Sequence, residues 1–220
     1  MGSPSVRVEL TPDGGRTAFS ERYGEHFHNR NGALTQAKRV FLEASQTDQH
    51  PAPRVLEIGF GLGVNFLTTL ASTSSRRVAL DYRAFEIDPQ PRELLESVGR
   101  DLPAAAHPLW TGLLSAWPAA RALELDGQRI DVAIADASAA ELPSQWASAI
   151  YLDGFSPTVN AELWSEAFIA RLAHTLAPGG WIVTYSAAGA VRRALAAAGL
   201  QVEREPGVAG KRESLRAQKR

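Results

Sequence analysis

The sequence contains no cysteine among its 220 residues. This absence excludes disulfide bonds, thiolate metal ligands and a cysteine nucleophile. The chain also lacks any run of about 18 apolar residues, and its N-terminus, MGSPSVRVEL, has no apolar core of signal-peptide length. We therefore expect a cytoplasmic protein with no membrane-spanning segment.

An excess of charge of one sign is also missing from the chain as a whole. The 23 Lys and Arg residues against 24 Asp and Glu residues give a formal net charge of −1, which argues against a nucleic-acid binder that works by charge alone. The segment from Ala188 to Arg220 is an exception, because it holds eight basic and three acidic residues, a local charge of 8 − 3 = +5. A terminal basic run is more often a solvated face than a binding site.

Apolar and turn residues along the chain predict strands that alternate with helices. With 45% hydrophobic residues the chain can bury a substantial core. Strands are predicted at residues 54–58, 82–88, 130–136, 148–155, 179–186, 200–205 and 212–217. Asp126-Gly127 can turn a hairpin ahead of the strand at 130–136. Helices are predicted at residues 32–45, 64–71, from 92, 160–177 and 188–199. This alternation predicts an α/β fold with a doubly wound, Rossmann-like, mostly parallel seven-stranded sheet.

The first 50 residues differ from this alternating pattern. An Asp13-Gly14-Gly15 turn between two alternating runs predicts a β-hairpin, and a helix follows it. We expect residues 1–50 to form a small extension packed on a core domain of residues 51–220.

The stretch RVLEIGFGLGVNFL, residues 54–67, has glycines at alternate positions between a strand and a helix. Such a turn places a cofactor site at the carboxyl end of the sheet. The dinucleotide fingerprint G-x-G-x-x-G requires a glycine where this chain has Val64, and this departure argues against NAD. Acids stand at three strand ends, as Glu57, Glu86 and Asp136.

This pattern resembles the class I S-adenosylmethionine-dependent methyltransferases. The resemblance implies that Glu57 lies near the amino-acid end of the cofactor, that Glu86 accepts the ribose hydroxyls and that Asp136 accepts from the adenine amine. Hydrogen bonds to ionised carboxylates suit these roles, because they are stronger than neutral ones. The residues expected at the cofactor are Glu57, Gly59, Phe60, Gly61, Gly63, Asn65, Glu86, Asp136, Asp153, Gly154 and Phe155.

A narrower resemblance rests on Asp153-Gly154-Phe155, followed by Pro157, Asn160 and Trp164. These residues, with GFGLGVNFL, FHNRNGALTQAKRVFL and GVAGKRESL on either side, resemble the methyltransferase domain of the MnmC family, which synthesises 5-methylaminomethyl-2-thiouridine in tRNA. The resemblance spans residues 6–217. It implies S-adenosylmethionine-dependent N-methylation of 5-aminomethyl-(2-thio)uridine at the wobble position.

Two departures from the family pattern have consequences. No flavin-dependent oxidase domain follows Arg220, so we expect a stand-alone methyltransferase that does not remove a carboxymethyl group. Thr35 and Gln36 stand where the family usually carries one or two acids, which leaves open how the N-terminal segment closes over the site.

The chemistry of methyl transfer assigns roles to further residues. Asp153 can orient an acceptor amine and receive or relay its proton, and the alternative is a helix cap or turn residue ahead of Gly154. Phe155 and Tyr185 can enclose an unstacked base, and each is also a common core residue. Phosphate contacts on the anticodon arm are expected from Arg192, Arg193, Lys211 and Arg212.

Alternative functions remain open on the sequence alone. A small-molecule amine methyltransferase or an aminopropyltransferase shares the sheet and an acid at the same strand end, and a non-enzymatic binding module is a third reading. His26 and His28 alternate along the chain, but no third ligand is near in sequence, so we expect no metal. The expected partners are tRNA, through its anticodon arm, and the enzymes that make the aminomethyl precursor.

Overall fold

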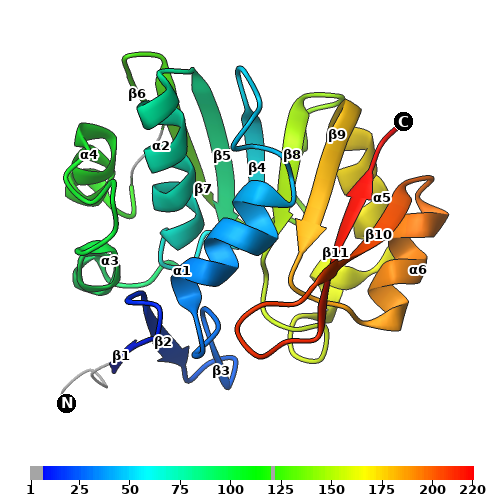
Figure 1. The fold of residues 1–220 in the computed structure, drawn as a ribbon, viewed down its shortest axis with the longest axis horizontal. Coiled ribbons are helices and arrows are strands. Elements are labelled where there is room, and N and C mark those ends of the chain that lie inside the picture. The colour runs from blue at the N-terminus through cyan, green and yellow to red at the C-terminus, as the bar shows by residue number, and fades with distance from the viewer. Residues whose placement is uncertain (1–6, 120–121) are drawn as a thin grey trace.

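The computed structural model describes residues 7–119 and 122–220, and its central feature is an eight-stranded sheet (Figure 1). The strand order is β10-β11-β9-β8-β4-β5-β7-β6. The five central strands are parallel, namely β4 (Arg54–Ile58), β5 (Leu80–Glu86), β7 (Gln128–Ile134), β8 (Ala147–Leu152) and β9 (Leu176–Thr184). Antiparallel strands complete both edges, namely β6 (Leu123–Leu125), β10 (Gln201–Pro206) and β11 (Glu213–Gln218).

The sheet has one strand more than the seven that the sequence predicts. The additional strand is β6, which pairs with β7 through a tight turn at Asp126 and Gly127. Both turn residues have positive φ, 50° and 76°, which is the backbone of the turn that best matches the twist of a hairpin. The alternating, mostly parallel architecture itself agrees with the prediction.

Helices cover both faces of the sheet and form two separate hydrophobic cores. One face carries α1 (Ala33–Gln36), the π-helix η1 (Ala37–Glu43), α2 (Val64–Arg76), α3 (Arg92–Gly99) and α4 (Pro108–Ala116). The other carries the 3-10 helix η2 (Ala161–Trp164), α5 (Glu166–Thr175) and α6 (Gly189–Ala197). Neighbouring residues of β4 divide between the cores, with Val55 in one and Leu56 in the other, as the period of a strand requires.

The single helix predicted for residues 160–177 is wrong. Ser165 has an extended backbone, with φ −66° and ψ 148°, and separates η2 from α5. Its hydroxyl accepts a hydrogen bond from the backbone N–H of Phe168 at 3.2 Å, so Ser165 is the N-cap of a new helix. At the other end, Leu176 already belongs to β9.

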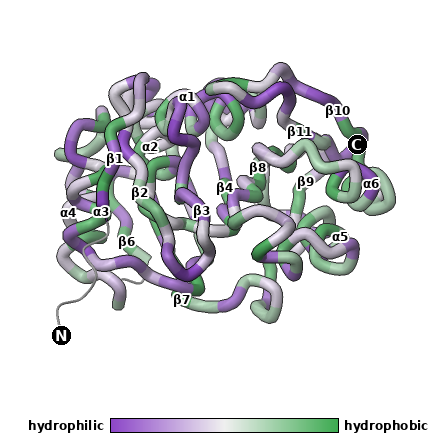
Figure 2. Tube along the Cα trace, turned by 90° about the horizontal axis from the view of Figure 1, so that it is seen from below, coloured by the Kyte–Doolittle hydropathy of each residue, from purple (hydrophilic) through white to green (hydrophobic). Residues whose placement is uncertain are grey.

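The N-terminal residues form a second, small sheet. The predicted hairpin is present as β1 (Val8–Leu10) and β2 (Arg16–Ser20), and β3 (Glu25–His26) adds a third antiparallel strand. Figures 1 and 2 place these strands beyond the carboxyl-terminal ends of the parallel strands. The boundary at residue 50 stays a prediction. Over the described parts of the chain, no helix combines the length and apolar character that crossing a membrane requires.

Candidate functional site

A cavity of about 530 Å³ lies at the carboxyl ends of the parallel strands. Cavities of this size are typical of small-molecule and cofactor sites, and this edge is where parallel sheets bind ligands. Residues directly after β4, β5, β7, β8 and β9 form its floor, and the segment from Tyr23 to Asn31 together with Lys211 forms its walls. The predicted site residues that line it are Gly59, Phe60, Gly61, Glu86, Asp136, Asp153, Gly154, Phe155, Tyr185 and Lys211.

The glycine loop after β4 brings two strand ends close together. Gly59 has φ 90°, and a Cβ atom built on it would lie 2.8 Å from the carbonyl oxygen of Asp153. Gly61 has φ 55°, and a Cβ atom there would lie 3.4 Å from the ring of Phe27. The positive φ favours glycine at both positions, and at Gly59 the close approach of the Asp153 backbone leaves no space for a Cβ atom.

Glu86, at the end of β5, binds the glycine loop. Its two carboxylate oxygens accept hydrogen bonds from the backbone N–H groups of Gly61, at 2.7 Å, and Asp88, at 2.8 Å. Burial raises the pKa of Glu86, while these backbone hydrogen bonds oppose the rise. Asp136, after β7, is exposed, and its side chain accepts a hydrogen bond from the Ser138 N–H at 2.8 Å.

Asp153, which follows β8, is joined to a buried polar network. The Nδ2 atom of Asn65 donates to Asp153 Oδ2 at 2.7 Å and to Glu57 Oε1 at 2.8 Å. Burial raises the pKa of Asp153 to about 8, and the Asn65 hydrogen bond and the charge of Lys211 act in the opposite direction. An acid with a pKa near neutrality can exchange a proton with a bound group at physiological pH.

Aromatic side chains enclose the cavity beside Asp153. The rings of Tyr23 and Phe155 are stacked, with centroids 4.2 Å apart, and Phe27 lies 5.3 Å from Phe155. The Tyr185 hydroxyl donates to the carbonyl oxygen of Gly154 at 2.8 Å. The Lys211 ammonium lies 3.9 Å from the centroid of the Tyr185 ring, a distance at which a cation is attracted to the ring face.

The N-terminal segment is held over the cavity by polar contacts from both sides. Glu25 accepts hydrogen bonds from the backbone N–H, at 3.0 Å, and from the hydroxyl of Ser156. On the other side, Asn29 Nδ2 donates to the carbonyl oxygen of Ala209 at 3.0 Å. The segment therefore connects the loop after β8 to the loop before β11.

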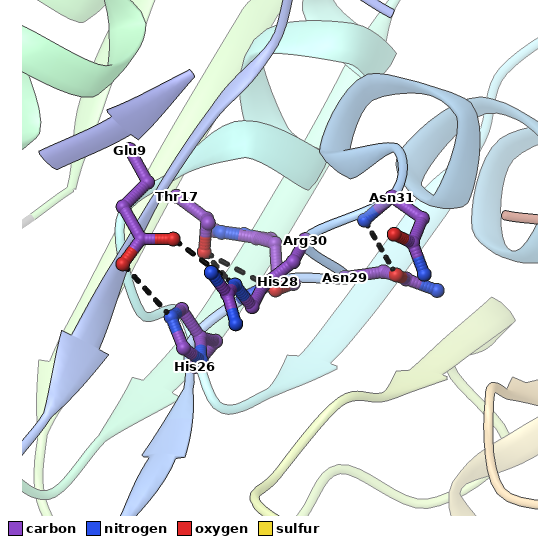
Figure 3. Close-up of polar contacts among 7 residues, drawn as sticks. All are labelled: Glu9, Thr17, His26, His28, Asn29, Arg30 and Asn31. Atoms are coloured by element: carbon purple, nitrogen blue, oxygen red, sulfur yellow. Dashed lines mark hydrogen bonds and ion pairs between the residues drawn. The ribbon is translucent and has the colours of Figure 1, made fainter. Parts of the chain in front are cut away.

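Figure 3 shows how this segment is attached to the small sheet. His26 and Arg30 both contact the carboxylate of Glu9, at 3.4 and 3.0 Å (Figure 3). The Thr17 hydroxyl exchanges hydrogen bonds with the backbone of His28. Across residues 7–119 and 122–220, no group of three His, Cys, Asp or Glu side chains is placed to hold a metal ion.

Some predicted site residues lie outside the cavity lining. Glu57 and Asn65 are buried beneath its floor, at 0% and 3% exposure. Gly63 packs behind the loop, where a Cβ atom would lie 2.8 Å from the Trp110 ring. Exposed positions away from the lining are occupied by Arg192, Arg193 and Arg212.

Other lining residues were not predicted, namely Tyr23, Glu25, Phe27, Asn29 and Ser156. They lie in segments without helix or strand periodicity, so their local sequence carries no positional signal. For the residues between Tyr23 and Asn31, the signals in the sequence are a clustering of aromatic, acidic and amide residues and the segment FHNRN, which resembles the MnmC family.

Comparisons with known proteins agree with this geometry. A family profile described as S-adenosyl-L-methionine-dependent methyltransferase matches residues 100–220. The chain is 37% identical, over 98% of its length, to the tRNA 5-methylaminomethyl-2-thiouridine biosynthesis bifunctional protein MnmC of Aromatoleum aromaticum, and covers 36% of that protein. The protein of the same description from Paracidovorax citrulli is also 37% identical to this chain. The match covers 97% of this chain and 35% of that protein. The chain thus spans little more than a third of these relatives.

Solved structures show the same fold. MnmC2 from Aquifex aeolicus superposes with a TM-score of 0.79 at 24% identity, covering 98% of this chain and 71% of that one. Spermidine synthase from Thermotoga maritima superposes with a TM-score of 0.59 at 15% identity, covering 98% and 70%. These structures confirm the predicted fold, and the family profile and the MnmC relatives confirm the predicted family resemblance.

Proposed function

Because the chain belongs to the family of S-adenosyl-L-methionine-dependent methyltransferases, we propose that it methylates the primary amine of 5-aminomethyl-(2-thio)uridine at the wobble position of tRNA. The observation that carries this proposal is Asp153, a carboxylate between the glycine loop and an aromatic wall. The similarity to the MnmC proteins over 98% of the chain supports the choice of acceptor.

The lining residues fit the cofactor. Gly59, Phe60 and Gly61 line the cavity, and the two glycines would let a ligand approach the backbone of this loop. Glu86 accepts one N–H at each oxygen, and a carboxylate has about four acceptor positions, so it can also accept two ribose hydroxyls. Asp136 is exposed at the neighbouring strand end and would accept from the adenine amine. When bound, the cofactor would supply an electrophilic methyl carbon.

Asp153 would prepare the amine for attack. A primary ammonium has no free electron pair, and its pKa is about 10, like that of lysine. A carboxylate of ordinary pKa, 3.8, is too weak a base to take that proton, whereas one with a pKa of about 8 is much closer. Once the proton has moved to Asp153, the hydrogen bond between the two groups would hold the amine in line with the methyl carbon.

The aromatic wall would enclose an unstacked base. Tyr23 covers one face of the Phe155 ring, so a base can stack only on the other face unless Tyr23 moves. Lys211 contacts Tyr185 and lines the cavity, so its charge would lie near the acceptor. Arg192, Arg193 and Arg212 remain the proposed contacts to backbone phosphates.

A methylation assay tests the proposal. Purified protein and labelled S-adenosylmethionine are incubated with tRNA from a strain lacking this gene, and nucleosides are then identified by mass spectrometry. We expect label in 5-methylaminomethyl-(2-thio)uridine and none in free polyamines. Label in a polyamine, or transfer of an aminopropyl group, would instead support the alternative that shares this fold.

Reversal of one exposed charge is expected to weaken tRNA binding. Arg212→Glu should lower the affinity about tenfold at low salt and make binding less dependent on salt concentration, because one phosphate contact is lost. Arg54→Glu is the matched control, because Arg54 is exposed at the start of β4, the end of the sheet opposite the cavity. Filter binding at several salt concentrations measures both variants. Equal loss in the two variants would contradict the assigned surface.

The raised pKa of Asp153 predicts a stability that depends on pH. Below pH 3.8 this carboxyl is protonated in both the folded and the unfolded chain and has no net effect. Between pH 3.8 and about 8 the unfolded chain ionises it and the folded chain does not, so its contribution to stability falls as pH rises.

Asp153→Asn removes this destabilisation and keeps an acceptor for the Asn65 amide. Without cofactor, we expect the variant to be more stable than the wild type at pH 8.5 by about 1 kcal/mol or more, which is about 2–4 °C in Tm. The difference should shrink towards pH 4.5. Thermal unfolding followed by circular dichroism measures it, and a constant difference across pH would contradict the raised pKa.

A further inference from the structure

The cavity carboxylate is tied to the protein interior by one buried amide. Asn65 lies in the first turn of α2 and is 3% exposed. Its Nδ2 atom donates to Asp153 Oδ2 at 2.7 Å and to Glu57 Oε1 at 2.8 Å. A primary amide carries two N–H donors, so this one group serves both carboxylates with no donor left over.

The far end of this network is buried in the sheet. The Tyr82 hydroxyl donates to Glu57 Oε2 at 2.8 Å, and both residues are 0% exposed. Glu57 and Tyr82 belong to the adjacent central strands β4 and β5. Asp153 is the one member that reaches the cavity, so the network runs from the centre of the sheet to the acceptor site.

Both N–H donors of Asn65 are bonded, but its side-chain oxygen is not. The Oδ1 atom is buried and has no hydrogen-bond partner among the described residues. Exchanging the two ends of the amide would place an oxygen against both carboxylates, so the observed orientation is the one that the carboxylates require. A buried acceptor left unpaired is costly, and its presence indicates that the two donated bonds are what this position needs.

Burial raises the pKa values of both acids, Glu57 and Asp153. Burial raises the pKa of Glu57 well above its ordinary value, and the neighbouring Asp153 charge adds to the rise. Two ionised carboxylates on one amide would repel each other. Asp153 is the member of the pair that lines the cavity, so it is the acid whose charge a bound group can change.

We propose that Asn65 is a positioning residue, which holds the Asp153 carboxylate in the orientation that faces the acceptor by bridging it to Glu57 and Tyr82. Among the described residues, Asn65 is the side chain that donates a hydrogen bond to this carboxylate. This inference rests on the proposed function, because the orientation of Asp153 matters only if Asp153 meets the acceptor. It also gives Asn65 a role different from direct contact with the cofactor.

The first test needs no substrate. Asn65→Leu keeps the approximate size of the side chain and removes both donors. The titration of Asp153 is followed by ¹³C NMR of aspartate-labelled protein, with the signal assigned by its loss in Asp153→Asn. Loss of a donor to the charged form should raise the pKa of Asp153 by about one unit. An unchanged titration would overturn the inference, even if no tRNA is methylated.

The second test uses turnover. We expect Asn65→Leu to lower kcat about 10- to 100-fold at pH 7.5, to recover part of the loss near pH 9.5, and to change cofactor Kd less than about threefold. Thr68→Val, one turn later on α2, removes a hydroxyl whose one partner among the described residues is the Val64 carbonyl, and it should leave rate and pH profile unchanged. A parallel loss of rate and cofactor affinity in Asn65→Leu would show a cofactor contact instead. Failure of the wild type to methylate tRNA would refute the proposed function and leave the NMR result standing.

Discussion

Asp153→Asn is expected to lower kcat for tRNA methylation by about 10²–10⁴-fold, the usual contribution of a general base. The substitution keeps the size of the side chain and an oxygen that accepts from Asn65. It removes the group whose pKa of about 8 allows it to take the proton of the amine. Cofactor affinity should change less than about threefold, because the missing function faces the acceptor.

Single-turnover kinetics with calorimetry separates these two effects. The wild-type rate should rise with pH through about 8 as Asp153 ionises, and the variant should lose this step and depend only on ionisation of the amine. Ser148→Ala is a useful control, because Ser148 bonds the backbone of Arg54 at the opposite end of the sheet. A variant that keeps more than half of the wild-type rate would rule out Asp153 as the base.

Gly61→Val is expected to weaken cofactor binding by at least about a hundredfold, which is about 2.7 kcal/mol. Gly61 lines the cavity with φ 55°, and its Cβ atom alone would already contact the Phe27 ring at 3.4 Å. Two further methyl groups must displace either Phe27 or a ligand that lies against the loop. A shift of the loop would also break the hydrogen bond from the Gly61 N–H to Glu86. Glu86, the proposed acceptor for the ribose hydroxyls, would then move as well.

The backbone strain of this variant needs its own control. A β-branched residue at positive φ destabilises the chain wherever it stands. Gly199→Val introduces the same residue at φ 81°, where no atom lies within 4 Å of the new Cβ. It should lose stability and keep cofactor affinity. Calorimetric titration of both variants with S-adenosylmethionine, below their unfolding temperatures, measures the difference. Similar affinities in the two variants would place the cofactor elsewhere.

The sequence by itself predicted the parallel strands and the glycines and acids at their carboxyl ends. Glycines after β4 and the acids Glu86 and Asp136 follow directly on strands, and the ends of parallel strands meet at one edge of a sheet. Their positions in space therefore follow from local pattern and topology. The same reasoning places Asp153 beside them.

Only the tertiary structure decided what faces Asp153 and what holds it. Asn29 meets Ala209 across 180 residues of chain, and Asn65 meets Asp153 across 88. Lys211 lies against Tyr185 in the cavity, whereas Arg212, its neighbour in sequence, is outside the lining. Such contacts depend on how loops without periodicity pack against distant elements, and no local pattern of residues encodes that packing.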